Sequence, residues 1–250
     1  MADEKDKSVD PSRRDFLKKS GYVAGGVVGG GVLGGLLGSE FWGDGTASDA
    51  PTEAEPQHDQ ALQYFKSRAD FEILSHATER IFPEDDNGPG AIALGVPYYI
   101  DHQLAGKWGI NAREYRQGPF HKGEPNQGYQ SALKHHQVFD LGIEALEKYS
   151  HATFNTNFAD LDGEQQDEVL MAFENDEVDM SVISSSLFFE LLRTLTIEGV
   201  YADPLYGGNK DKQGWAMKEY PGVQLSYTDR IESEDFIEID PASLHDTFNR

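Results

Sequence analysis

Apolar side chains recur at helical intervals through the middle of the chain. Phe71, Leu74, Ala77 and Ile81 are spaced three and four residues apart, and Pro83 follows them. Residues at this spacing share one face of an α-helix, because a helical turn contains about 3.6 residues. Since proline cannot continue a helix, the stretch predicts an amphipathic helix that ends just before Pro83.

Four further stretches show the same period, which predicts a helical domain. Their apolar faces run over residues 96–104, 129–149, 169–173 and 188–195. Asp162 and Gln165 have the spacing of a capping box and predict the start of the fourth helix. Residues 184–201 are the most apolar stretch, which favours a central position. Because no strands alternate with these helices, the pattern disfavours a doubly wound α/β fold and predicts a mainly α class.

Two long loops rich in glycine and proline interrupt the helical pattern. The first covers residues 82–90, and the second covers residues 203–222. Glycine and proline fix turns in such loops. The second loop also carries Tyr206, Trp215 and Tyr220, whose side chains combine apolar area with a polar tip. We therefore expect a compact helical domain from which these loops extend.

The N-terminal residues have the pattern of an export signal. Arg13 and Arg14 precede the apolar pair Phe16 and Leu17, and the 20 residues between Lys19 and Glu40 carry no charge. A basic region before an uncharged segment is typical of signal peptides, and the paired arginines indicate the twin-arginine route. A helix of 20 residues would span about 30 Å, so both cleavage and retention as a membrane anchor stay open.

These patterns divide the chain into four parts. Residues 1–48 are the signal segment, 49–61 a linker, 62–228 the helical domain, and 229–250 an acidic tail with seven acidic residues and two arginines. A G-x-G-x-x-G match at 29–34 falls inside the signal segment. It lacks the preceding strand that a dinucleotide-binding turn requires, so it does not predict nucleotide binding.

Composition excludes several classes of function. The 250 residues include 44 Asp and Glu against 21 Lys and Arg, a formal net charge of −23. This acidity argues against a nucleic-acid binder, which needs a basic face to displace counterions from phosphates. The absence of cysteine excludes disulfides, thiolate metal sites and a cysteine nucleophile. Hydrophobic residues make up 38%, enough for a packed core.

No catalytic, cofactor-binding or metal-binding residues are identified in the pattern of polar residues. None of the eight histidines forms an H-E-x-x-H pair. His135 and His136 are adjacent and would point about 100° apart on a helix; His136 falls on the apolar stripe and is expected to be a hydrogen-bonded core residue. The acidic run 84–88 lacks the ligand order of an EF-hand and predicts a turn. Ser184 to Ser186 are interpreted as the start of a helix, and Glu198 with Asp203 as a structural pair.

The second loop and the residues before it carry a resemblance to a known family. Residues 198–215 read Glu-Gly, Asp-Pro, Tyr-Gly-Gly-Asn and Gly-Trp in order, and residues 81–83 and 99–106 add Ile-Phe-Pro and Tyr-Ile-Asp-His-Gln-Leu-Ala-Gly. Together with the twin-arginine start, this string resembles the gluconate 2-dehydrogenase subunit 3 family.

The resemblance implies a small, non-catalytic subunit that holds no cofactor of its own. Such a subunit accompanies a large FAD-containing oxidoreductase of the glucose–methanol–choline (GMC) type, in many cases with a multihaem cytochrome c that carries haem c. The complex oxidises a sugar, a sugar acid or a polyol. The small subunit engages the twin-arginine translocase and supports maturation of the flavoprotein. The complex is expected at the outer face of the cytoplasmic membrane or in the space beyond it.

We expect the second loop to lie at or near the interface with that partner, because buried aromatic residues are the usual hot spots of stable interfaces. The residues singled out are Glu198, Asp203, Tyr206, Gly207, Gly208, Asn209 and Trp215. Packing inside the domain is an equal alternative for them. Two other functions also stay open: a stand-alone exported oxidoreductase that uses the region around Glu198 and Asp203, and a structural envelope protein.

Overall fold

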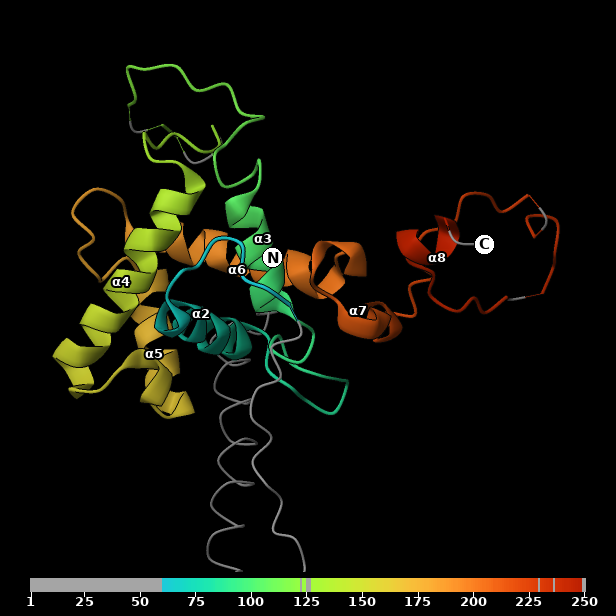
Figure 1. Ribbon diagram of the computed structural model, residues 1–250, viewed down its shortest axis with the longest axis horizontal. Coiled ribbons are helices and arrows are strands. Elements are labelled where there is room, and N and C mark those ends of the chain that lie inside the picture. Colours follow the sequence, from blue (N-terminus) through green and yellow to red (C-terminus); the bar gives the residue numbers. More distant parts are fainter. Residues whose placement is uncertain (1–59, 122, 125–126, 229, 236, 249–250) are drawn as a thin grey trace, which may run out of the picture. The chain divides into compact units, whose positions relative to one another are not determined.

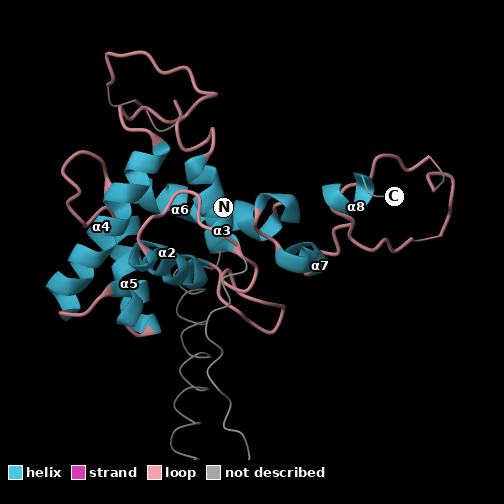
Figure 2. Ribbon diagram, viewed as in Figure 1, coloured by secondary structure: helices cyan, strands magenta, loops and turns pink. Residues whose placement is uncertain are grey.

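The computed structural model describes residues 60–250 apart from 122, 125, 126, 229, 236, 249 and 250 (Figure 1). The expected signal segment and all but the end of the expected linker lie outside the described residues. Within the described part, all regular secondary structure is helical, and strand-like pairing is limited to three isolated bridges (Figure 2). The mainly α class is therefore confirmed.

The described chain contains five long helices and several short ones. The long helices are α2 (Arg68–Ile81), α3 (Val96–Ala105), α4 (His135–Phe154), α5 (Gly163–Glu174) and α6 (Ser185–Tyr201). The short ones are η1 (Phe158–Asp160), η2 (Pro204–Tyr206), η3 (Lys210–Lys212), α7 (Gln213–Ala216) and α8 (Leu244–Phe248). None of the helices described has both the length and the apolar composition needed to cross a bilayer.

Side chains at the helix starts explain where the helices begin. The Asp162 carboxylate accepts the backbone N–H of Gln165 at 2.9 Å, and the Gln165 side chain accepts the N–H of Asp162 at 3.2 Å. This reciprocal pair is the predicted capping box. The hydroxyl of Ser184 accepts the N–H of Leu187, so the serine run is a helix start. Helix α2 ends at Ile81, as the proline at 83 predicts.

The third predicted helix begins later than its apolar stripe suggests. Helix α4 starts at His135, so Tyr129 and Leu133 precede it. The side-chain carbonyl of Asn111 accepts the N–H of His135 at 2.8 Å, and the hydroxyl of Tyr129 donates to the carbonyl of Leu133 at 2.7 Å. The bond from Asn111, 24 residues away, fixes the start of the helix, and the bond from Tyr129 holds the segment before it. The spacing of apolar residues within the helix does not reveal either bond.

Helix α6 packs against α2, α3, α4 and α5, the position expected for the most apolar segment. In its first turn, Phe188 meets Phe139 of α4 and Phe173 of α5 edge to face, with ring centroids 5.5 Å and 5.8 Å apart. All three rings are fully buried. Gly142 of α4 faces the Phe188 ring, and a Cβ at that position would overlap the ring. The core therefore depends on close packing of one helix between four others.

Two buried carboxylates attach segments that are distant in sequence. Asp167 of α5 forms a bidentate ion pair with Arg80 of α2, at 2.8 Å and 2.7 Å. Asp101 of α3 is fully buried and accepts backbone N–H groups from three consecutive residues, 63 to 65, at 2.6–3.0 Å. The segment that enters α2 is thereby fixed to α3, because a buried carboxylate must have its hydrogen bonds satisfied.

Candidate functional site

The 203–222 loop packs its backbone directly on the C-terminal end of α6. A Cβ on Gly208 would overlap the carbonyl of Gly199, and a Cβ on Gly214 would overlap the carbonyl of Val200. Only glycine allows this approach of two backbones. The glycines of the family-like string therefore have a structural role in closing the loop on the helix.

Asn209 holds the middle of this loop together. Its side chain is completely buried, and its amide donates to the carbonyl of Ala202 at 2.8 Å. Its side-chain carbonyl accepts the N–H of Gly214, also at 2.8 Å. The backbone of Asn209 is in the left-handed region at φ 48°, which asparagine tolerates better than most residues. Asn209 therefore acts inside the loop.

Trp215 is 5% exposed and packs within the domain. Its indole N–H donates to the carbonyl of Tyr201 at 2.8 Å, and its ring meets the edge of Tyr220 at 5.5 Å between centroids. A partner protein has no access to this side chain in this conformation. Asn209 and Trp215 therefore both pack within the domain.

Asp203 caps the turn that follows α6. It is 9% exposed, and its two oxygens accept the N–H groups of Leu205 at 3.0 Å and Leu244 at 2.8 Å. Because both oxygens are engaged by backbone groups, the side chain has a structural role.

The end of the acidic segment 229–250 packs against the same 203–222 loop. Ala242 pairs with Gly222 in a parallel bridge and is buried. Lys212 donates to the carboxylate of Asp246 at 2.9 Å. The pKa of Asp246 is lowered by the N–H of Ser243, which it accepts, and by the Lys212 ammonium. The tail is thus not solvated throughout, because part of it covers the 203–222 loop.

Glu198 and Tyr206 are the accessible members of the predicted set. Glu198 accepts a hydrogen bond from the hydroxyl of Tyr99 at 3.3 Å. Burial and the negative charge of Glu198 raise the pKa of Tyr99, so this phenol stays protonated and donates. Tyr206 is half exposed, and the apolar side chains of Leu205, which precedes it, and of Ile197 in α6 are also exposed, Leu205 by 60%.

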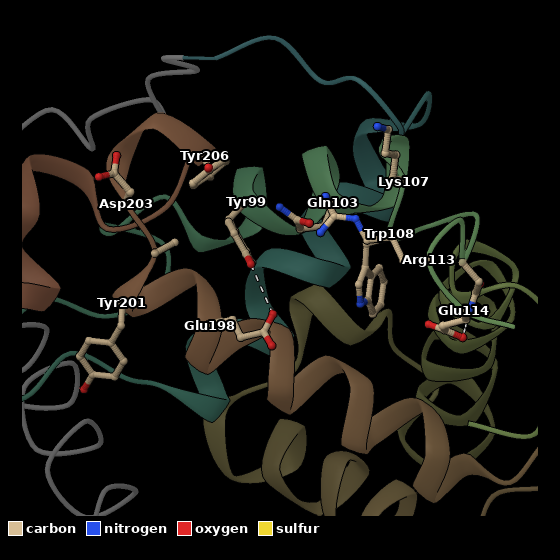
Figure 3. A pocket seen from close by; sticks show the side chains of 12 residues that line it. Tyr99, Gln103, Lys107, Trp108, Arg113, Glu114, Glu198, Tyr201, Asp203 and Tyr206 are labelled. Carbon is tan, nitrogen blue, oxygen red and sulfur yellow. Dashed lines mark hydrogen bonds between the residues drawn. The ribbon is translucent and has the colours of Figure 1, made fainter. Parts of the chain in front are cut away.

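Glu198, Asp203 and Tyr206 line an open pocket of about 720 Å³ (Figure 3). We call it the α3–α6 pocket, because residues of both helices form its walls. The residues that line it are Tyr99, Gln103, Lys107, Trp108, Asn111, Arg113, Glu114, Glu198, Tyr201, Ala202, Asp203 and Tyr206. The other four residues of the predicted set, at 207, 208, 209 and 215, are not in its lining.

The opposite wall of this pocket is formed by residues 107–114, which carry no sequence motif. We call it the 107–114 segment. Trp108 in this segment stacks on His135, with ring centroids 4.0 Å apart and planes at 24°. The Nδ1 atom of His135 lies 3.1 Å from the carbonyl oxygen of Trp108. The sequence offers one weak signal for the stacking of Trp108 on His135. Trp108 lies in the loop that leads to the adjacent pair His135 and His136.

The expectation that His136 is the core histidine was wrong. His135 is the buried one, at 4% exposed, and burial lowers its pKa. His136 is partly exposed and lies 3.3 Å from the hydroxyl of Tyr64. The reason is the Trp108 side chain, which covers His135 at the first position of α4. The spacing of apolar residues within one helix does not show which of its side chains a residue from a distant loop will bury.

The acidic run at 84–88 forms a turn. Asp85 accepts the backbone and side-chain N–H groups of Asn87 at 2.8 Å and 2.9 Å, and these bonds lower its pKa. The backbones of Asp85 and Gly88 exchange two hydrogen bonds of 3.1 Å. Across the described residues, no three His, Asp or Glu side chains are placed to hold one metal ion.

Comparison with known proteins places the chain in a family. The family model for gluconate 2-dehydrogenase subunit 3 matches residues 68–222, which include α2 to α6 and the whole 203–222 loop. The chain therefore belongs to the gluconate 2-dehydrogenase subunit 3 family. Membership in a family of dehydrogenase subunits implies dehydrogenase partner subunits. No curated protein and no solved structure matches the chain significantly.

Proposed function

We propose that this chain is the small accessory subunit of an exported, FAD-dependent dehydrogenase of the GMC type that oxidises a sugar, a sugar acid or a polyol. The match to the subunit 3 family over residues 68–222 carries the proposal. FAD belongs to the large partner, and haem c belongs to a cytochrome subunit where one accompanies the pair.

The N-terminal sequence supports a role in export. Arg13 and Arg14 stand before an uncharged segment of 20 residues, which is the twin-arginine pattern. The twin-arginine route carries proteins that have already folded. A flavoprotein that binds its FAD in the cytoplasm can therefore cross the membrane with this subunit, provided that the two associate first. The complex then works at the outer face of the cytoplasmic membrane or in the space beyond it.

Exposed apolar side chains give the subunit a surface for such an association. Ile197, Leu205 and Tyr206 lie close in sequence around the end of α6, and each is at least 42% exposed. Burial of apolar area is the main driving force for stable association, and aromatic residues are enriched at such interfaces. Of these three side chains, Tyr206 also lines the α3–α6 pocket.

Replacement of the two signal arginines tests the proposal. The double variant Arg13→Lys with Arg14→Lys keeps the charge but removes the paired arginines. In cells that carry only this variant, we expect the large flavoprotein to remain in the cytoplasm. Cell fractionation followed by measurement of flavin-dependent dehydrogenase activity in each fraction gives the result.

A matched control keeps the twin arginines and changes the neighbouring bases. Lys18→Arg with Lys19→Arg also exchanges two basic side chains without a change of charge, and it should leave the distribution of the flavoprotein unchanged. If the flavoprotein still reaches the exterior in full amount in the Arg13/Arg14 variant, this subunit does not carry its export signal, and that part of the proposal is wrong.

A further inference from the structure

A closed set of contacts holds the 107–114 segment on the start of α4. The backbone N–H of His135 donates to the side-chain carbonyl of Asn111 at 2.8 Å, and the side-chain amide of Asn111 donates to Glu114, also at 2.8 Å. The second carboxylate oxygen of Glu114 lies 3.6 Å from the Nε2 atom of His135. The contacts therefore begin and end at the same histidine. We call these three residues the His135 cluster.

The backbone of the segment depends on the same cluster. The N–H of His136 donates to the carbonyl of Gly109 at 3.0 Å, next to the bond between His135 and Asn111. Asn111 is 4% exposed, and its backbone is in the left-handed region at φ 55°, which asparagine tolerates. The first two amides of α4 are therefore protected only while the 107–114 segment is in place.

Two aromatic rings enclose the imidazole of His135. Trp108 stacks on it with centroids 4.0 Å apart, and Tyr129 meets it edge to face at 4.6 Å. The His135 side chain is 5% exposed as a result. A charged imidazole in this position would lose most of its hydration, which is a cost that the neutral form does not have.

The acceptors around the imidazole determine which nitrogen carries its hydrogen. Nδ1 of His135 lies 3.1 Å from the carbonyl oxygen of Trp108, which can only accept, so the hydrogen of the neutral ring is on Nδ1. Nε2 then presents a lone pair to the carboxylate of Glu114, and two acceptors 3.6 Å apart form no hydrogen bond. A second proton would go to Nε2, between His135 and Glu114.

The surroundings of His135 decide whether that second proton is favoured. Burial has the largest influence and lowers the pKa of His135, while the Trp108 carbonyl and the charge of Glu114 act in the opposite direction. Arg116 acts with burial, and its guanidinium lies 5.7 Å from the centre of the Tyr129 ring. The Glu114 side chain is 37% exposed, so water screens its attraction. The closed cluster therefore holds the neutral imidazole.

We infer that the His135 cluster is a pH-sensitive switch, which holds the 107–114 segment on α4 while the imidazole is neutral and releases it in acid. When the segment opens, the imidazole enters water and has its ordinary pKa of about 6.5. The stabilisation is fully present above that value and is lost as pH falls from it toward the lowered pKa of the closed state.

Release of the segment would change one wall of the α3–α6 pocket. Trp108, Asn111 and Glu114 all line this pocket, and Figure 3 shows Trp108 and Glu114 on the same side of it. Local opening of a single segment needs less free energy than unfolding of the domain. The pocket is therefore expected to have two states, with the state at neutral pH being the one described above.

Hydrogen exchange in the full chain tests the switch. The backbone amides of His135 and His136 are followed between about pH 7.5 and pH 5.5, with correction for the intrinsic pH dependence of exchange. Their protection should fall by up to about tenfold, which is the gain in proton binding of a free imidazole over this range. The amide of Leu187, which donates to the Ser184 hydroxyl at the start of α6, should keep its protection.

Two adjacent histidines provide a matched pair of variants. His135→Gln removes the titrating group and should abolish the fall in protection between the two pH values. His136→Gln removes a partly exposed histidine beside it and should leave the fall unchanged. If His135→Gln does not fold, nuclear magnetic resonance titration of the His135 ring in the unmodified chain replaces it, with a midpoint expected below about 6.5.

Several results would overturn the inference. Constant or increased protection of the two amides in acid shows that protonation does not release the segment. An equal loss of protection at Leu187 shows that acid destabilises the whole domain instead. A fall that persists in His135→Gln, or that disappears in His136→Gln, assigns the effect to another group. A ring of His135 that titrates at or above about 6.5 shows that the closed cluster favours the charged form.

Discussion

The 203–222 loop and the 107–114 segment use their polar side chains differently. In the 203–222 loop, the side chains of Asp203 and Asn209 are occupied by backbone groups of the same domain. In the 107–114 segment, Lys107 and Arg113 have no partner among the described residues. The motif residues by which the family resemblance was recognised, such as Asp203 and Asn209, therefore hold the loop on α6. The charged side chains without a partner in the described chain, Lys107 and Arg113, lie in a segment that has no recognisable motif.

The largest effect should come from the interior of the 203–222 loop. Trp215→Ala removes a buried ring and its hydrogen bond to the carbonyl of Tyr201, and it should lower the free energy of unfolding by about 3–5 kcal/mol. Chemical denaturation of the purified chain measures the change. Tyr220→Ala, which removes the half-exposed neighbouring ring, should cost only about 1 kcal/mol. Equal costs for the two variants would show that the loop does not depend on its buried ring.

A smaller and local effect should come from the ion pair between Asp246 and Lys212, which joins the C-terminal segment to the 203–222 loop. The pKa of Asp246 is lowered in the folded state by the Ser243 N–H and by Lys212, so its ionised form favours folding. This contribution is fully present above the ordinary carboxyl pKa of about 4 and is lost as pH falls below it.

Hydrogen exchange of the backbone amides that join the C-terminal segment to the 203–222 loop measures this effect. The N–H groups of Leu244 and Val223 are bonded across the contact, and their protection from exchange should fall as pH drops below about 4. Asp246→Asn should show the reduced protection already at neutral pH. Unchanged protection in this variant at neutral pH would mean that the ion pair does not hold the segment on the loop.

The smallest effect on stability should come from the 107–114 segment. Lys107→Ala with Arg113→Ala removes two exposed side chains that have no partner in the described part of the chain. The free energy of unfolding should change by less than about 0.5 kcal/mol, as is usual for surface substitutions. A loss comparable with that of Trp215→Ala, in the same denaturation experiment, would assign these side chains a structural role and remove the contrast between the loop and the segment.

The helical part of the fold was predictable because its causes are local. The periods around Phe71 and Phe188 predict α2 and α6, and the capping box at Asp162 predicts the start of α5. The start of α4 was not predictable, because the side chain of Asn111 fixes it from 24 residues away. The assignment of the core histidine failed for the same reason.

The candidate site was predictable only in part. Three of the seven residues proposed for the interface line the pocket, namely Glu198, Asp203 and Tyr206. Aromatic and glycine-rich composition does not distinguish a residue that packs a loop, such as Trp215, from one that faces a partner. Lys107 and Arg113 were not predicted, because isolated charged residues in a loop form no periodic pattern or motif. They share a pocket with Glu198 only in the folded chain.

The central claim is that this chain is assembled with a flavoprotein. Its most direct test is the mass and the flavin content of the tagged full chain after purification from its native host under non-denaturing conditions. The account predicts a complex well above the 27.8 kDa of the chain alone, in which a second, larger polypeptide carries the flavin. A chain that purifies alone, or one that holds the flavin itself, would contradict it.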